Sequence, residues 1–96
     1  MGIILTSVKI DYPLRIFLTN VQADKISYTK FLDESIDKCS EVIQKISYDF
    51  SSRPYPFTFK FQEETLKKID NLSEVLHTTR SDIIRRLIFA KVHNLC

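Results

Sequence analysis

Glycine is almost absent from this sequence, which has one in 96 residues. A glycine-rich phosphate loop of the kind used by nucleotide-binding enzymes is therefore excluded. The two cysteines, Cys39 and Cys96, form neither a C-x-x-C pair nor any other metal-binding spacing. No nucleophile lies beside a base, because Tyr48, Asp49 and the two histidines are too scattered for a site. We expect no enzyme, no metal and no cofactor.

Long apolar runs are also missing. No stretch approaches the roughly 20 residues that a membrane-spanning helix requires. The short run Ile3–Leu5 lacks the basic lead and the cleavage site of a secretory signal peptide. We therefore expect a soluble protein of the cytoplasm, a reducing compartment, with no membrane contact.

The sequence does contain enough apolar material for a core. Hydrophobic residues make up 44% of the chain, so one compact unit is expected instead of a disordered segment. The formal net charge of +2 is small for a nucleic-acid-binding domain. Positive charge nevertheless gathers near the C-terminus, at Arg80, Arg85, Arg86 and Lys91. A local basic field is expected there.

The C-terminal half has the pattern of a strand followed by two helices. Phenylalanines alternate with polar residues from Phe57 to Phe61, which predicts a strand with one apolar face. Apolar residues at helical spacing predict a helix from about Glu63 to Leu76. The sequence Thr-Arg-Ser-Asp at residues 79–82 has the form of a helix cap and predicts a last helix.

The N-terminal half is predicted to begin with two strands. Residues 2–10 are rich in β-branched side chains and end at the turn-forming residues 11–13. A second strand is predicted at Leu14–Leu18, where the aliphatic residues share one face and Arg15 and Phe17 share the other.

Helices are predicted to follow these strands. A capping-box sequence at residues 19–22 predicts a helix that begins near Asn20. An apolar stripe from Leu32 to Ile46 predicts a second, stronger helix.

A single short strand such as 57–61 needs a partner strand, because its backbone groups cannot pair with one another. Two paired strands would pack their phenylalanine face on the helices and leave Thr58 and Lys60 exposed. A two-stranded ribbon fits the major groove of DNA, where such polar side chains reach base edges. The amides of Thr79, Arg80 and Ser81, at the start of the last helix, suit a DNA phosphate.

The stretch from Phe57 to about Ala90 resembles the ribbon-helix-helix repressors of the Arc, MetJ and CopG type. The resemblance rests on the alternating strand, the amphipathic helix and the Thr-Arg-Ser-acid start of the second helix. It implies that Thr58 and Lys60 read bases and that Thr79, Arg80 and Ser81 contact phosphates. His77 departs from the pattern, because the family often has glycine at this turn, where a left-handed backbone is needed.

A repeat within the chain extends this interpretation. Tyr12-Pro13 precedes the predicted strand 14–18 as Tyr55-Pro56 precedes the strand 57–61. We therefore expect an α+β fold of two tandem ribbon-helix-helix motifs, a single-chain pseudo-dimer with an extra N-terminal strand. The first, degenerate unit would span residues 1–50, a linker 51–56 and the second unit 57–96, around one shared core.

In the tandem arrangement the face toward DNA would carry Arg15, Phe17, Thr58 and Lys60. Phe17 on that face is ambiguous, and burial beneath another segment is the favoured alternative. The extra N-terminal strand either widens or covers the ribbon, or protects its edge. The rival arrangement is one C-terminal motif that forms a homodimer, with residues 1–50 as an accessory segment. Higher oligomers on DNA remain open in both arrangements.

The expected function is sequence-specific binding of double-stranded DNA and transcriptional regulation, as a repressor or an activator. The chain also resembles repeated ribbon-helix-helix regulators of filamentous archaeal viruses, which implies the host cytoplasm as its location. The alternative is an antitoxin-like or other protein-binding module. Because few residues follow the last helix, such a partner would have to use the N-terminal segment.

Overall fold

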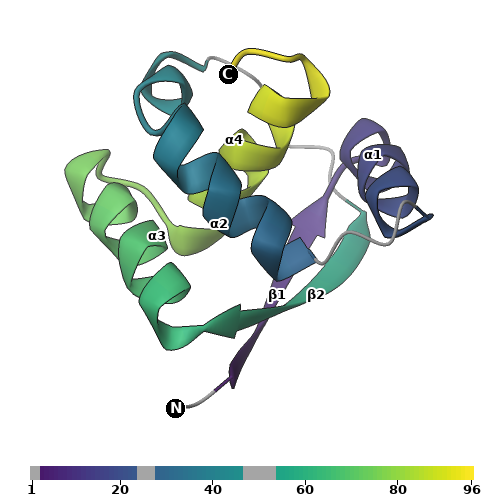
Figure 1. Ribbon diagram of the computed structural model, residues 1–96, viewed down its shortest axis with the longest axis horizontal. Helices are drawn as coiled ribbons and strands as arrows, with labels where there is room; N and C mark the ends of the chain where they lie inside the picture. The colour runs from purple at the N-terminus through teal and green to yellow at the C-terminus, as the bar shows by residue number, and fades with distance from the viewer. Residues whose placement is uncertain (1–2, 24–27, 47–53) are drawn as a thin grey trace.

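The computed structural model describes residues 3–23, 28–46 and 54–96, which form an α+β fold. Within these ranges, one antiparallel two-stranded sheet packs against four α-helices (Figure 1). The elements in chain order are β1 (Ile3–Ile10), α1 (Tyr12–Ala23), α2 (Tyr28–Cys39), a 3₁₀ turn η1 (Val42–Lys45), β2 (Tyr55–Gln62), α3 (Glu63–Val75) and α4 (Arg80–Val92).

The two strands of the sheet come from opposite halves of the sequence. β1 pairs with β2 over its whole length, with Ile3 opposite Gln62 and Ile10 opposite Tyr55. Residues 2–10 were predicted to form an extra strand, and the structure pairs Ile3–Ile10 of this range with the phenylalanine strand. Gly2 lies outside the described residues.

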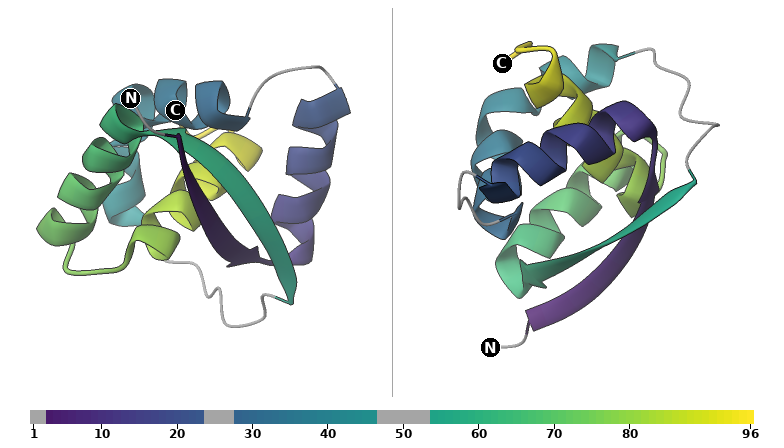
Figure 2. Two further views of the ribbon diagram at one scale, coloured as in Figure 1. Left: turned by 90° about the horizontal axis from the view of Figure 1, so that it is seen from below. Right: turned by 90° about the vertical axis from the view of Figure 1, so that its right-hand side faces the viewer.

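One face of the sheet, the inner face, is covered by helices, and the other lies open in the view from below (Figure 2). Val8, Ile10, Phe59 and Phe61 point inward and are buried. They belong to a core to which both halves of the sequence contribute. The alternation predicted for residues 57–61 is confirmed, because Thr58 and the other polar residues of that strand are exposed.

The second helix of each half packs on the strand of the other half. α4 contacts β1 and α2 contacts β2, while α2 and α4 pack against each other. The first helix of each half contacts both halves, since α1 contacts α4 and α2, and α3 contacts α4, β2 and α2. The strands are therefore held together through the helices as well as through their backbone ladder.

The predicted second strand at Leu14–Leu18 is wrong, because these residues lie within α1. Asp11 begins this helix by accepting a hydrogen bond from the backbone amide of Leu14 at 3.1 Å. Leu14 and Leu18 are four residues apart and are both buried, which is helical spacing. Thr19 was predicted to begin a helix, but it lies inside α1, where its hydroxyl donates to the carbonyl of Arg15.

The second half follows its sequence pattern closely. α3 and α4 occupy the predicted ranges, and Thr79 caps α4 by accepting a hydrogen bond from the amide of Asp82 at 3.1 Å. His77 adopts a positive φ of 52°, the left-handed conformation expected at this turn. The backbone then closes α3 with a hydrogen bond from the amide of Thr78 to the carbonyl of Ser73.

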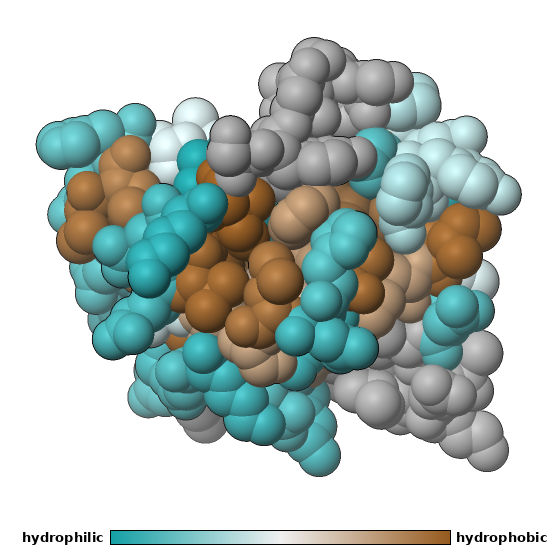
Figure 3. Space-filling view, turned by 90° about the horizontal axis from the view of Figure 1, so that it is seen from above, coloured by the Kyte–Doolittle hydropathy of each residue, from teal (hydrophilic) through white to brown (hydrophobic). Residues whose placement is uncertain are grey.

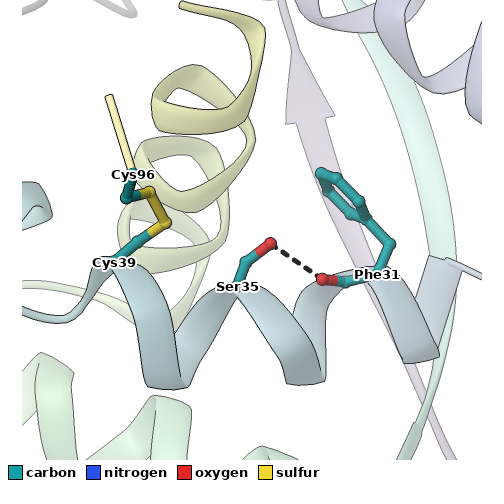
Figure 4. The surroundings of a disulfide bond; sticks show 4 residues. All are labelled: Phe31, Ser35, Cys39 and Cys96. Carbon is teal, nitrogen blue, oxygen red and sulfur yellow. Dashed lines mark hydrogen bonds between the residues drawn. A yellow bond between two sulfur atoms is a disulfide. The ribbon is translucent and has the colours of Figure 1, made fainter. Parts of the chain in front are cut away.

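The apolar stripe at residues 32–46 is divided between two elements. α2 ends at Cys39, and Ile43 lies in the short turn η1. Cys39 forms a disulfide with Cys96, with 5.4 Å between their Cα atoms, and so ties the end of α2 to the end of the chain (Figure 4). This bond was not predicted, because the cysteines were assigned to a reducing environment. Residues 51–53 of the predicted linker lie outside the described ranges.

The inner face contains one unsatisfied polar atom among the described residues. The hydroxyl oxygen of Thr6, opposite Phe59 in the ladder, is buried and has no hydrogen-bond partner. We expect Thr6→Val to raise the free energy of unfolding by roughly 1 kcal/mol, because it removes a desolvated hydroxyl and keeps the shape of the side chain. Urea unfolding measures the change. The exposed variant Thr58→Val is the control, expected to change stability by less than about 0.5 kcal/mol. A loss of stability in Thr6→Val would show that the hydroxyl is satisfied.

Candidate nucleic-acid interface

The open side of the sheet, called here the outer face, carries the alternate residues of both strands. Its members are exposed and are Ile3, Leu5, Ser7, Lys9, Pro56, Thr58, Lys60 and Gln62. In the left view of Figure 2 the sheet lies in front of α4, with α3 and α1 to its two sides, and no helix of the described part of the chain crosses in front of it. The outer face is therefore a narrow, two-stranded surface accessible to a large partner.

Four polar residues of the outer face are arranged symmetrically about its centre. Ser7 lies directly opposite Thr58 in the ladder. Lys9 follows Ser7 by two residues, and Lys60 follows Thr58 by two residues. Because the strands are antiparallel, the two lysines lie on opposite sides of this central hydroxyl pair. Their positions are four residues apart along the ribbon, or about 13 Å.

Two of these four residues, Ser7 and Lys9, were missed by the sequence analysis. Thr58 and Lys60 were predicted as base-reading residues, and both lie on the outer face. Ser7 and Lys9 were missed because β1 was interpreted as an extra strand. A signal was present, since Ser7-Val8-Lys9 and Thr58-Phe59-Lys60 share a hydroxyl–apolar–lysine pattern.

Arg15 and Phe17 do not lie on the outer face, so their predicted place on the ribbon is wrong. Both belong to α1. The guanidinium of Arg15 lies 4.6 Å from the ring centre of Tyr55, a cation–π contact. Phe17 is partly buried, with its ring 5.5 Å from that of Phe31, so the alternative of burial is confirmed. A role for either residue in binding DNA would need a contact away from the ribbon.

At the start of α4, Thr79 and Arg80 already have partners within the chain. The Thr79 hydroxyl caps the helix, and the Arg80 guanidinium donates through Nε and Nη2 to both carboxylate oxygens of Asp70, at 2.8 and 2.9 Å. These hydrogen bonds raise the pKa of Arg80. The pair connects α3 with α4 and neutralises a carboxylate that would otherwise repel an anion at the helix N-terminus.

Two of the arginines expected to create a basic field have structural roles. Arg85 is buried, and its Nε donates to the backbone carbonyl of Lys9 at 2.8 Å. Arg86 pairs with Asp82 at 2.8 Å and also donates to the carbonyl of Ile43 at 2.9 Å. Arg85 thus fixes α4 against β1, and Arg86 fixes it against η1. The positive charge of the outer face comes from the lysines instead.

The described residues contain no cluster of three or more His, Cys, Asp or Glu side chains that could hold a metal ion. No helix within them combines the length and apolar character needed to cross a bilayer.

Sequence comparison links the chain to a viral protein. It is 31% identical over 70 residues to "Uncharacterized protein 29" of Sulfolobus islandicus filamentous virus (isolate Iceland/Hveragerdi), and the match covers 73% of each chain. The chain belongs to the family of this viral protein. That kinship agrees with the expected relation to filamentous viruses of archaea. No family model matches the chain, and no solved structure matches it.

Proposed function

We propose that the chain binds double-stranded DNA at specific sequences and regulates transcription, with the outer face in the major groove. The outer face carries the proposal, because it is two strands wide and exposes a lysine on each side of a central pair of hydroxyls. A major groove admits a ribbon of that width. Lysine and hydroxyl side chains are donors that suit the base edges there.

We further propose that the fold is a single-chain counterpart of a ribbon-helix-helix dimer, in which β1 supplies the second ribbon strand. The packing of α4 on β1 and of α2 on β2 supports this arrangement, because each second helix then covers the strand of the other half. So does the spacing of equivalent residues, since Ser7 and Lys9 precede the helix cap Asp11 just as Thr58 and Lys60 precede the cap Gln62. The repeat unit then begins with β1, and the repeat inferred from the two Tyr-Pro pairs is replaced.

Phosphate contacts complete the proposal. In such a dimer the second helix of each half directs its first amides toward the DNA backbone, which places the start of α4 beside one strand. Thr79, Arg80 and Ser81 are the residues there. Arg80 can keep its pair with Asp70 and still present its remaining N–H groups to a phosphate, because a guanidinium has five donors.

Duplex binding is expected to weaken steeply with salt. With roughly four to eight phosphates engaged, log K falls with log salt at a slope of about −4 to −7. Fluorescence anisotropy of a labelled duplex at several salt concentrations measures the slope. Arg80→Ala should flatten it by about one unit. The control is Lys45→Ala, which removes an exposed positive charge from η1, an element that packs on α4 and is not part of the outer face. Absence of any duplex binding would remove DNA from the function.

A protein-binding module remains the second candidate, and one observation favours it. Ile3 and Leu5 are 67% and 65% exposed at the N-terminal end of β1, an unusual exposure for aliphatic side chains. A protein partner at this end would bind with little dependence on salt, because the contact is apolar. The face turned away from the sheet also exposes apolar side chains among polar ones (Figure 3). The salt titration distinguishes the two functions.

A further inference from the structure

The two ends of the outer face are not equivalent, although its centre is symmetrical. At one end Lys60 lies opposite Leu5, and Gln62 lies opposite Ile3. All four of these side chains are exposed. This end therefore offers an amide and two aliphatic side chains beyond its lysine.

The other end has less to offer a DNA base. Lys9 lies opposite Pro56, which has no donor. The next equivalent position is Asp11, which is buried and accepts a hydrogen bond from the amide of Leu14. Gln62, its counterpart, begins α3 without any side-chain hydrogen bond to the helix. The two ends therefore differ chemically: the carboxylate of Asp11 already accepts a hydrogen bond from α1, whereas the side-chain amide of Gln62 makes none to α3.

The spacing of the lysines limits what they can reach together. A separation of about 13 Å along a ribbon corresponds to roughly three to four base pairs in a groove that advances about 3.4 Å per pair. Lysine is suited to guanine O6 and N7. Because Lys9 and Lys60 are related by the symmetry of the antiparallel pair, they address guanines on opposite DNA strands.

We infer that the outer face reads an oriented, non-palindromic DNA site. The site has two G·C pairs roughly three to four base pairs apart, with their guanines on opposite strands, and A·T pairs adjoin only the guanine read by Lys60. Gln62 provides a donor and an acceptor for adenine, and Leu5 an apolar contact for the thymine methyl. The inference rests on the proposed function and adds to it the form of the site and the direction in which the protein lies on it.

Selection of binding sites from a pool of random duplexes tests the inference, with sequencing of the enriched DNA. For the wild-type protein we expect a consensus without full two-fold symmetry. Lys9→Ala and Lys60→Ala should each reduce the preference at one G·C pair by roughly 5- to 150-fold, at opposite ends of the consensus core. Gln62→Ala should relax only the A·T pairs beside the pair that Lys60→Ala affects. Lys45→Ala should leave the consensus unchanged.

Several results would overturn the inference while leaving DNA binding intact. One is a fully palindromic consensus. Another is that both lysine variants relax the same base pair, or pairs more than about six apart. A third is that Gln62→Ala relaxes both ends equally. Thermal unfolding of each variant confirms that it is folded, as expected for exposed positions. No enrichment of any duplex would reject the proposed function itself.

Discussion

Cys96→Ser is expected to lower the free energy of unfolding by about 4 kcal/mol. The disulfide from Cys39 to Cys96 closes a loop with a sequence separation of 57 residues, so its loss frees a long segment of the unfolded chain. Cys96 is the better position to change, because its side chain is exposed and its replacement leaves no cavity. Cys39 is buried among core residues, and its replacement would also disturb packing.

Urea unfolding with and without a reducing agent measures this effect. Reducing agent should destabilise the wild-type protein by the same amount and should have no further effect on Cys96→Ser. Cys39→Ser should be at least as unstable as Cys96→Ser, since it also places a polar hydroxyl where a sulfur atom is buried in the core. Equal stability of the reduced and oxidised wild-type protein would show that the bond does not form in solution or contributes nothing.

Phe59→Ala is expected to lower the free energy of unfolding by about 3–5 kcal/mol. The side chain is fully buried on the inner face, and its ring lies 5.2 Å from that of Phe57 and 5.6 Å from that of Phe61. No neighbour can fill a cavity of this size without moving a strand or a helix. The control is Thr58→Ala, the adjacent residue on the outer face, expected to change stability by less than about 0.5 kcal/mol.

The unfolding midpoint of the wild-type protein and of Phe59→Ala should not depend on protein concentration. Both strands of the sheet belong to one chain, so folding requires no second molecule. A midpoint that rises with concentration would indicate a homodimer, the arrangement weighed as the rival. A loss much below 3 kcal/mol for Phe59→Ala would mean that the core is less closely packed than the structure shows.

The second half of the chain could be predicted because local patterns and tertiary packing agree there. The alternation of Phe57 to Phe61 matches a sheet with one buried face, and the cap at Thr79 forms as expected. The left-handed turn at His77 was also predictable, since a helix followed directly by a second cap leaves few conformations for the residues between.

The first half was predicted wrongly because the same residues fit both the two-residue period of a strand and the period of a helix. Leu14, Ile16 and Leu18 alternate as in a strand, but Leu14 and Leu18 also match a helix, and Ile16 is exposed. Asp11 as a cap and Pro13 in the first turn favour the helix, a combination that outweighs the alternation. The pairing of β1 with β2 and of Cys39 with Cys96 connects residues far apart in sequence, so neither could be derived from local pattern.

The pairing of the first strand with a strand from the second half has a consequence for synthesis. The ribosome adds about 5–20 residues per second, so roughly three to ten seconds separate the emergence of β1 from that of β2. During this interval Ile3, Leu5 and Val8 have no partner strand to pair with. On a messenger translated by several ribosomes, β2 of a preceding chain can emerge before β2 of the same chain has been made. β1 is therefore the segment through which newly made chains can form a domain-swapped pair, before β1 has paired with β2 of its own chain.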